Sequence, residues 1–213
     1  APVKLAPEDA EWRLEKTGEL LEVLKRLGFN RFIEKWGLGE EQAGTEGEES
    51  RAEALPELEL SPGEVIERIK AAGYVAVRPG EDMSELTLCD GEAVFGISQI
   101  TAGAEWNDVV DVLFDKDVKK VAHGVKDFMG LALSEGVQPE GFVFDTELAA
   151  YALDPTESSY PIERLSSRHL GAEKPEIQAL YELYPALDKK IEEMGAKELY
   201  YDIELPLCRV LAD

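Results

Sequence analysis

The segment between Lys119 and Pro155 constrains the fold of this chain more than any other stretch. It holds two short extended runs, Lys120–Ala122 and Phe142–Phe144. Between them, the run from Lys126 to Ser134 carries enough apolar side chains to bury one face of a short helix. A strand, a helix and a second strand within so little chain are typical of an α/β layer fold.

A second helix is predicted directly after the second extended run. The carboxylate of Asp145 can accept hydrogen bonds from the free backbone amides at the start of a helix that runs through Leu153. The helix is expected to stop before Pro155, because a proline pushes the preceding residue out of helical geometry. Asp145 is therefore interpreted as a structural helix cap.

The first part of the chain is predicted to hold a helical segment and a linker. Leucines recur at helical spacing within residues 8–36, and Gly28 is expected to end the first of two helices there. The apolar stripe on these helices needs a partner, either the main domain or a neighbour. From Gly37 to Pro56, glycine and glutamate dominate, which is typical of a flexible acidic linker.

The middle of the chain combines helices with a β-hairpin. Ser61 can cap a helix that begins at Pro62, with Glu64 completing a capping box. Asp90–Gly91 is a strong hairpin-turn signal. The other expected elements are extended runs at Tyr74–Val77, Glu85–Cys89 and Ala93–Ile97, and helices at Trp106–Phe114, Ile162–Leu170, Glu176–Met194 and from Lys197 onward. Pro206 predicts a kink or a late start in the last helix, and the order of elements predicts a mixed sheet flanked by helices.

Composition limits the partners of the chain. Its 213 residues include 45 acidic and 22 basic ones, a net charge of −23, so most of its surface is expected to repel DNA.

Cys89 and Cys208 have no second Cys or His at metal-ligand spacing and are interpreted as reduced thiols of a cytosolic protein. No apolar run of about 18 residues and no signal peptide is found. The chain starts without Met and is expected to be a piece of a larger protein.

Three phrases stand out by their order and spacing: VKKVAHGVKD at 118–127, FDT with LDP at 144–155, and IELPL with VL at 203–211. Together they resemble the 3′–5′ exonuclease module of bacterial DNA polymerase I, a family-A polymerase. The first resembles the family's strand leading into a Lys-x-x-Asp helix, the second its FDT…L..YLL.P phrase, and the third the helix that opens its polymerase domain. Residues 10–38 further resemble the tail of its 5′-nuclease region.

The resemblance implies a ribonuclease H-like fold of the DnaQ-like exonuclease type, with an N-terminal helical appendage. It divides the chain into four segments. Residues 1–38 would be the helical tail of the 5′-nuclease region, and 39–60 an acidic Gly/Glu-rich linker. Residues 61–198 would be the 3′–5′ exonuclease-like domain, and 199–213 the start of the polymerase-domain helix.

The resemblance also implies where a working exonuclease would hold its metals. The family uses two divalent ions, bound by four carboxylates and accompanied by a Tyr that orients the attacking water. The first two acids form a D-x-E motif at the end of the first strand. That motif falls on Arg78, Pro79 and Gly80, so both acids are lost.

Of the remaining two acids, the third is present and the fourth is missing from its expected place. Asp127 is present at the third position, as a relic ligand or, the favoured interpretation, as a first-turn acid that complements the helix dipole. The fourth acid belongs to a Y-x-x-x-D motif expected near residues 173–178, where no such pair occurs. Tyr184 and Asp188 satisfy the bare pattern but lie later in the chain.

Other polar residues are expected to have structural roles. Arg78 is expected to pair with a carboxylate rather than with a phosphate. His123 and His169 are interpreted as hydrogen-bonded or exposed side chains, since neither has a recognisable Ser or Cys partner. The three tryptophans are expected to be packing residues, because no basic groove interleaves them.

Two functions remain open. The first is a non-catalytic structural domain of a cytoplasmic DNA polymerase I, with no cofactor or metal of its own and no membrane contact. Its partners would be the adjacent polymerase and 5′-nuclease domains and, through the parent enzyme, DNA; the parent would be a DNA-directed DNA polymerase, a nucleotidyltransferase of replication and repair. The alternative is an active two-metal 3′–5′ exonuclease, proofreading or RNase D-like, with Mg²⁺ or Mn²⁺ bound by Asp127, Asp188 and acids such as Glu81, Asp82 or Glu85.

Overall fold

The computed structural model describes residues 18, 20, 23–24 and 54–212. The chain divides into two compact units, Ala1–Ser50 and Arg51–Asp213. In the first unit the described residues are all helical, as predicted for residues 8–36: Gly18, Leu20, Val23 and Leu24. The predicted second helix, the linker up to residue 53 and two of the three tryptophans lie outside the described residues.

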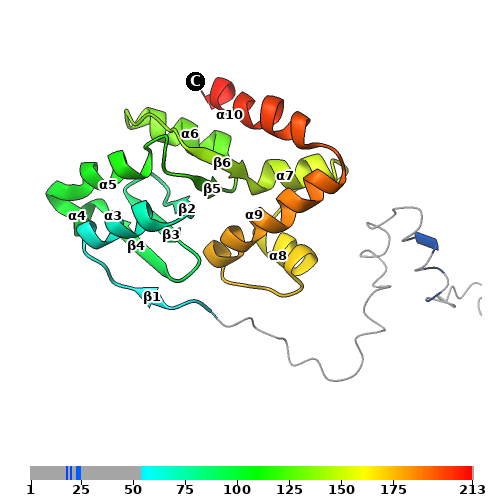
Figure 1. The fold of residues 1–213 in the computed structure, drawn as a ribbon, viewed down its shortest axis with the longest axis horizontal. Helices are drawn as coiled ribbons and strands as arrows, with labels where there is room; N and C mark the ends of the chain where they lie inside the picture. Colours follow the sequence, from blue (N-terminus) through cyan, green and yellow to red (C-terminus); the bar gives the residue numbers. More distant parts are fainter. Residues whose placement is uncertain (1–17, 19, 21–22, 25–53, 213) are drawn as a thin grey trace, which may run out of the picture. The chain divides into compact units, whose positions relative to one another are not determined.

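The second unit is built on a six-stranded sheet with the order β1-β4-β3-β2-β5-β6 (Figure 1). Its strands are β1 (Glu57–Leu58), β2 (Val75–Pro79), β3 (Glu85–Cys89), β4 (Val94–Ser98), β5 (Lys120–Ala122) and β6 (Phe142–Asp145). β3 is antiparallel to both β2 and β4, whereas β2, β5 and β6 run parallel. The predicted mixed sheet and the hairpin turn between β3 and β4 are confirmed.

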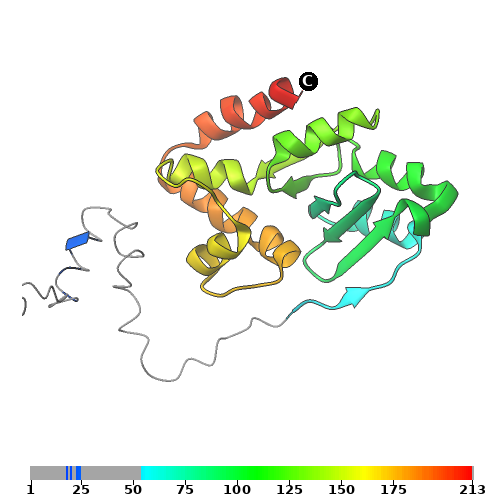
Figure 2. The ribbon, with the colours of Figure 1, turned by 180° about the vertical axis from the view of Figure 1, so that it is seen from behind.

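Helices flank both faces of this sheet (Figures 1 and 2). They are α3 (Pro62–Ala71), α4 (Gln99–Ala102), α5 (Trp106–Leu113), α6 (Val125–Ser134), α7 (Thr146–Leu153), α8 (Ile162–Leu170), α9 (Glu176–Glu193) and α10 (Leu205–Ala212), with a 3-10 turn η3 (Gly103–Glu105) and a π-helical stretch η4 (Leu199–Glu204). The strand, helix, strand and helix predicted after Lys119 agree with β5, α6, β6 and α7 to within one residue. The capping box of α3 is also confirmed, since Ser61 Oγ accepts from Glu64 N and Glu64 Oε2 accepts from Ser61 N.

Alternation along β2 separates two hydrophobic cores. Val75 and Val77 belong to a cluster formed with α3, α5 and α6. Ala76, between them, belongs to a second cluster formed with α7, α8 and α9. Successive side chains of a strand point to opposite faces, so the three residues join both layers to one strand. Trp106 is buried in the first cluster, which confirms its predicted packing role.

Some described residues of the second unit lie inside the predicted linker 39–60. β1 pairs in parallel with β4, with Glu57 opposite Val94 and Leu58 opposite Phe95. Leu55 N also donates a hydrogen bond to Gln178 Oε1 at 3.1 Å. Residues 54–60 are therefore part of the folded unit, although a two-residue strand has too little periodicity to be predicted.

The last segment of the chain packs on the same unit. The α-helical geometry of α10 starts at Leu205, next to Pro206, as expected for a late start. Tyr200 of η4 is fully buried in the second core, and Cys208 of α10 is buried in the first. α10 runs beside α6 (Figures 1 and 2). The packing therefore continues across the predicted boundary between residues 198 and 199.

Lys120 is a buried cation that the sequence did not single out. Its side chain is fully buried, and Nζ donates to Val118 O at 2.9 Å and to Glu140 O at 2.5 Å. Nζ also lies 5.6 Å and 5.4 Å from the ring centroids of Phe114 and Phe142. Burial lowers the pKa of the Lys120 ammonium to about 7, because it disfavours the charged form more than nearby carboxylates favour it.

Two further findings concern the cysteines and the possible membrane-spanning helices. Both cysteines, Cys89 and Cys208, are free and buried. In the part of the chain that the structure describes, no helix combines the length and the apolar character needed to cross a bilayer.

Candidate functional site

The end of β2 is where the resemblance places the first two metal ligands. Arg78 NH1 lies 2.7 Å from Glu176 Oε2, at the start of α9. The prediction that Arg78 pairs with a carboxylate is confirmed. Glu176 lies within residues 173–178, the region expected to hold the fourth acid. At the end of β2 a guanidinium therefore partners a carboxylate of that region.

Gly80 is part of a tight turn rather than a ligand position. Its N–H donates to Glu85 O at 2.7 Å. A Cβ at Gly80 would lie 3.3 Å from Glu85 Cβ, closer than ordinary van der Waals contact. A larger side chain at position 80 would therefore need the start of β3 to shift.

Asp127 lies in the first turn of α6, with its side chain 83% exposed. Its carboxylate contacts Lys126 Nζ at 3.1 Å. The position agrees with the interpretation of Asp127 as a first-turn acid, whose charge complements the N-terminus of the helix.

Two of the acids proposed as metal ligands of an active exonuclease, Asp82 and Asp188, have separate local partners. Asp82 Oδ1 accepts hydrogen bonds from both Ser84 N and Ser84 Oγ within the turn after β2. Asp188 Oδ1 accepts from Tyr201 OH at 2.7 Å, near Lys197, which lies 3.9 Å from Oδ2. Tyr184 packs edge-on against Tyr74. Asp188 thus belongs to the contact of α9 with the C-terminal segment, and Tyr184 belongs to the packing of α9 against Tyr74.

The described residues do not fit the metal pair that the fold class implies. Among residues 54–212 and the few described before them, no group of three or more His, Cys, Asp or Glu side chains is arranged to hold a metal ion. Hard divalent cations need several convergent oxygen ligands. Here the acid near the strand end is paired with Arg78, and Asp127 with Lys126. No reaction step through a metal follows from this arrangement.

Asp145 was predicted to cap α7, and the structure shows that it caps two helices. Oδ1 accepts from Glu147 N at 2.9 Å and Leu148 N at 3.3 Å, which confirms the predicted cap. Oδ1 also accepts from Gly124 N at 3.0 Å, and Oδ2 accepts from Val125 N at 2.7 Å, at the start of α6. Burial raises the pKa of the Asp145 carboxyl, and the N–H groups oppose the rise because they stabilise the ionised form.

Position 124 must be in a left-handed conformation to bring α6 to this carboxylate. Gly124 has a φ of 73°, which side chains other than glycine adopt with strain. The glycine directly before α6 was the signal that could have indicated the second cap in the sequence.

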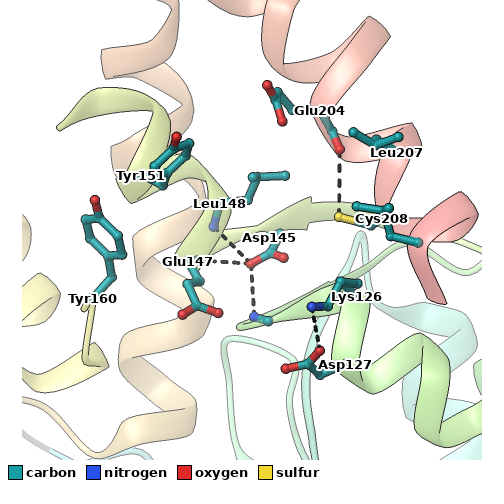
Figure 3. A pocket seen from close by; sticks show the side chains of 12 residues that line it. Lys126, Asp127, Asp145, Glu147, Leu148, Tyr151, Tyr160, Glu204, Leu207 and Cys208 are labelled. Carbon is teal, nitrogen blue, oxygen red and sulfur yellow. Dashed lines mark hydrogen bonds and ion pairs between the residues drawn. The ribbon is translucent and has the colours of Figure 1, made fainter. Parts of the chain in front are cut away.

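A pocket of about 370 Å³ lies beside Asp145, between α6, α7 and α10 (Figure 3). Its walls are partly apolar, with Leu148 and Tyr151 from α7 and Leu207 and Leu211 from α10. Its charged lining residues come from several elements: Lys126, Asp127, Asp145, Glu147 and Glu204. The sequence did not predict this pocket, because it forms where segments distant in the chain meet.

Both histidines have hydrogen-bond partners, as predicted. His123 Nδ1 lies 2.9 Å from Thr146 Oγ1. His169 Nδ1 lies 2.6 Å from Lys190 Nζ, and burial, with the neighbouring positive charges of Lys190 and Arg168, lowers the pKa of His169 to about 4. His169 is therefore neutral at pH 7 and accepts a hydrogen bond from the ammonium.

Comparison with known proteins defines the class of the fold. No protein-family model matches the chain. Among solved structures, RNase D of Escherichia coli, an exoribonuclease involved in structured RNA processing, has a TM-score of 0.62 and 14% identity, over 75% of this chain and 51% of that chain. The predicted class is thereby confirmed: the chain has an α/β fold of the ribonuclease H-like, DnaQ-like exonuclease type.

Within that class, the chain is similar to bacterial DNA polymerase I. DNA polymerase I of Bacillus subtilis is 23% identical over 252 residues, which cover 100% of this chain and 27% of that polymerase. The POL domain of Pol1 from M. smegmatis, in complex with DNA primer-template and dNTP, has a TM-score of 0.65 and 26% identity over 73% of this chain and 31% of that chain. The predicted resemblance of the chain to bacterial DNA polymerase I is confirmed, and the chain holds a 3′–5′ exonuclease-like domain.

Proposed function

We propose that this chain is a non-catalytic 3′–5′ exonuclease-like domain of a DNA polymerase I. The observation that carries the proposal is the ion pair between Arg78 and Glu176. At the strand end where the fold class places its first metal-binding acids, this chain has a guanidinium, and that guanidinium neutralises the nearby acid of α9. A site that already contains a positive side chain and lacks convergent carboxylates has little affinity for Mg²⁺ or Mn²⁺.

The role of such a domain is structural. In the parent enzyme it would lie between a 5′-nuclease and a polymerase domain and would support the latter in DNA replication and repair. The net charge of −23 favours this role, because a surface of this sign repels the phosphates of DNA. DNA would then be bound by the rest of the parent enzyme, a cytoplasmic DNA-directed DNA polymerase and nucleotidyltransferase.

The test is a nuclease assay on the purified chain. Single-stranded DNA and RNA oligonucleotides, labelled at the 5′ end, are incubated with millimolar Mg²⁺ or Mn²⁺ and with EDTA as control. We expect no metal-dependent shortening of either substrate. The matched variant Asp127→Ala separates the protein's own activity from contamination, since a contaminating nuclease would act equally in both preparations.

The alternative function, an active proofreading or RNase D-like exonuclease, is favoured by the fold, which is shared with RNase D. It makes the opposite prediction for the same assay. Metal-dependent release of nucleotides that Asp127→Ala abolishes would establish it and refute the non-catalytic role.

A further inference from the structure

The C-terminal segment Leu199–Ala212 is apolar on two sides. On the inner side Tyr200, Leu205 and Cys208 are buried. On the outer side are five large apolar side chains that are 40% to 69% exposed; we call them the C-terminal apolar face: Leu199, Ile203, Leu207, Val210 and Leu211. From Leu199 to Val210 they are three or four residues apart, and Leu211 lies four residues after Leu207, which keeps the five on one side of the helix. A helix that is apolar on both sides is normally covered on both sides.

The C-terminal apolar face continues into the pocket beside Asp145. Leu207 and Leu211 belong to both. Leu207 faces Leu148 and Tyr151 across the pocket (Figure 3). The pocket is therefore a hollow at the edge of a larger apolar surface. Its volume of about 370 Å³ suffices for one large side chain.

The rim of this hollow is acidic. Glu147 and Glu204 line it (Figure 3), and within the described part of the chain neither carboxylate is in an ion pair. Asp127 also lines the pocket and is balanced by Lys126. Apolar walls with two unpaired carboxylates fit a cation on an aliphatic stem, because the stem packs on the walls while the charge stays at the rim.

We propose that the C-terminal apolar face and this pocket form one docking surface for a basic amphipathic helix of a protein partner, with one Arg or Lys side chain in the pocket. This inference rests on the proposed function, in which the partner helix belongs to the polymerase domain of the parent chain. The exposed ring of Tyr151 at the pocket adds an aromatic surface for the cation.

Charge complementarity favours this occupant over two others. A second copy of the chain would bring another net charge of −23 and the same acidic rim, so two copies repel each other. A nucleic acid would bring phosphates to the unpaired carboxylates Glu147 and Glu204. Of these three occupants, a basic helix is the one that satisfies both the apolar face and the rim.

The first test uses two peptide probes and the 213-residue chain. One probe is an amphipathic helical peptide with leucines on one face and arginines beside them. The other is the same peptide with citrulline, which is neutral and similar in shape, in place of each arginine. We expect the arginine peptide to shift the backbone amide resonances of Gly124, Leu148 and Leu211 in nuclear magnetic resonance spectra, and to bind about tenfold more tightly than the citrulline peptide.

Variants then test the two parts of the surface separately. Glu147→Gln with Glu204→Gln removes the rim charges and should weaken arginine-peptide binding about five- to tenfold, whereas the matched charge change Glu67→Gln on α3 should not. Val210→Asp places a charge on the C-terminal apolar face and should weaken both peptides at least tenfold. Its control is Ile100→Asp, since Ile100 is 93% exposed on α4, outside this surface.

Two results would overturn the docking proposal. One is equal binding of the arginine and citrulline peptides, or resonance shifts scattered over other surfaces. The other is a dimer in sedimentation experiments that Val210→Asp dissociates, because the occupant would then be a second copy. Neither result depends on the nuclease assay, and nuclease activity would refute the non-catalytic role without changing the peptide measurements.

Discussion

The hydroxyl of Tyr200 lies 2.8 Å from both the backbone nitrogen and the backbone oxygen of Asp145. It accepts a hydrogen bond from the N–H and donates one to the carbonyl. The carboxylate of Asp145 meanwhile accepts backbone N–H groups of α6 and α7. One residue at the end of β6 therefore fixes two helix N-termini and, through Tyr200, the C-terminal segment.

Replacing Tyr200 by Phe should destabilise the domain measurably. The variant keeps the ring but leaves the N–H and the C=O of Asp145 without their partner in a buried place. We expect the free energy of unfolding to fall by about 2 kcal/mol in urea titrations followed by circular dichroism. Tyr151→Phe is the control, because Tyr151 is half exposed, and its loss should be near zero. Equal stability of the two variants would contradict the importance of this contact.

Asp145→Asn should be destabilising for a different reason. An amide of the same shape has one accepting oxygen and an NH₂ group, which faces backbone donors instead of accepting from them. We expect a loss of about 2 to 4 kcal/mol in the free energy of unfolding, measured in the same way. The control is Asp108→Asn, an exposed first-turn acid of α5, which should cost less than about 1 kcal/mol. A small effect at both positions would refute the double cap.

Lys120 should make stability depend on pH. Its pKa is about 7 in the folded chain and about 10.4 in an unfolded one. Between these values the unfolded chain binds more protons, so the contribution of Lys120 to the free energy of unfolding rises with pH, by at most about 1.4 kcal/mol per unit. Below pH 7 both states hold the proton and this dependence disappears.

The measurement is the difference in unfolding free energy between the wild type and Lys120→Met from pH 6 to pH 9. The difference should move in favour of the wild type as the pH rises above 7. Lys119→Met, at the exposed neighbouring position, should show a constant difference. A constant difference for Lys120→Met as well would show that the buried amine does not titrate in this range.

The ion pair at the end of β2 should contribute little to stability. The side chains of Arg78 and Glu176 are 50% and 41% exposed, so water screens their attraction. Arg78→Ala should lower the free energy of unfolding by less than about 1 kcal/mol. Glu176→Ala should have an effect of similar size, and the double variant should lose no more than the larger single effect plus a few tenths. If either single variant lowered the free energy of unfolding by well over about 1 kcal/mol, the ion pair would contribute substantially to stability.

Both thiols should be unreactive in the folded protein. Burial raises the pKa of the Cys208 thiol to about 11 and also raises that of Cys89, so little thiolate is present at neutral pH. Ellman's reagent at pH 7.5 should label neither within minutes and both once urea unfolds the chain. Cys89→Ser and Cys208→Ser assign any residual reaction. Rapid labelling of the folded wild type would show that α10 detaches readily, since Cys208 is covered by its packing.

Local signals in the sequence predicted most of the fold. Ser61 and Glu64 are three residues apart, so their capping box was visible as a pattern. The alternation in β2 and the turn at Asp90–Gly91 are of the same kind, because the residues that decide the structure are neighbours in the chain. These elements lie where they were expected.

Long-range contacts were not predictable in this way. Asp145 and Tyr200 are 55 residues apart, and no periodicity links them. The burial of Lys120 likewise depends on carbonyls and rings from two separate stretches, residues 114–118 and 140–142. At the candidate site, the exposed setting of Arg78 predicted a carboxylate partner, but its identity as Glu176 required the packing of α9 against β2. The pocket was missed for the same reason, since its walls come from three helices.

The burial of Tyr200 has a practical consequence for anyone who isolates this domain. Cutting the chain after Glu198, where sequence resemblance places the end of the domain, would remove Tyr200, the largest fully buried side chain among the residues that the structure describes. The truncated product would keep strands β1 to β6 yet have a hole beside Phe144, and water would enter at the end of β6. We therefore expect a stable fragment to include both Tyr200 and α10, whose Cys208 is buried as well.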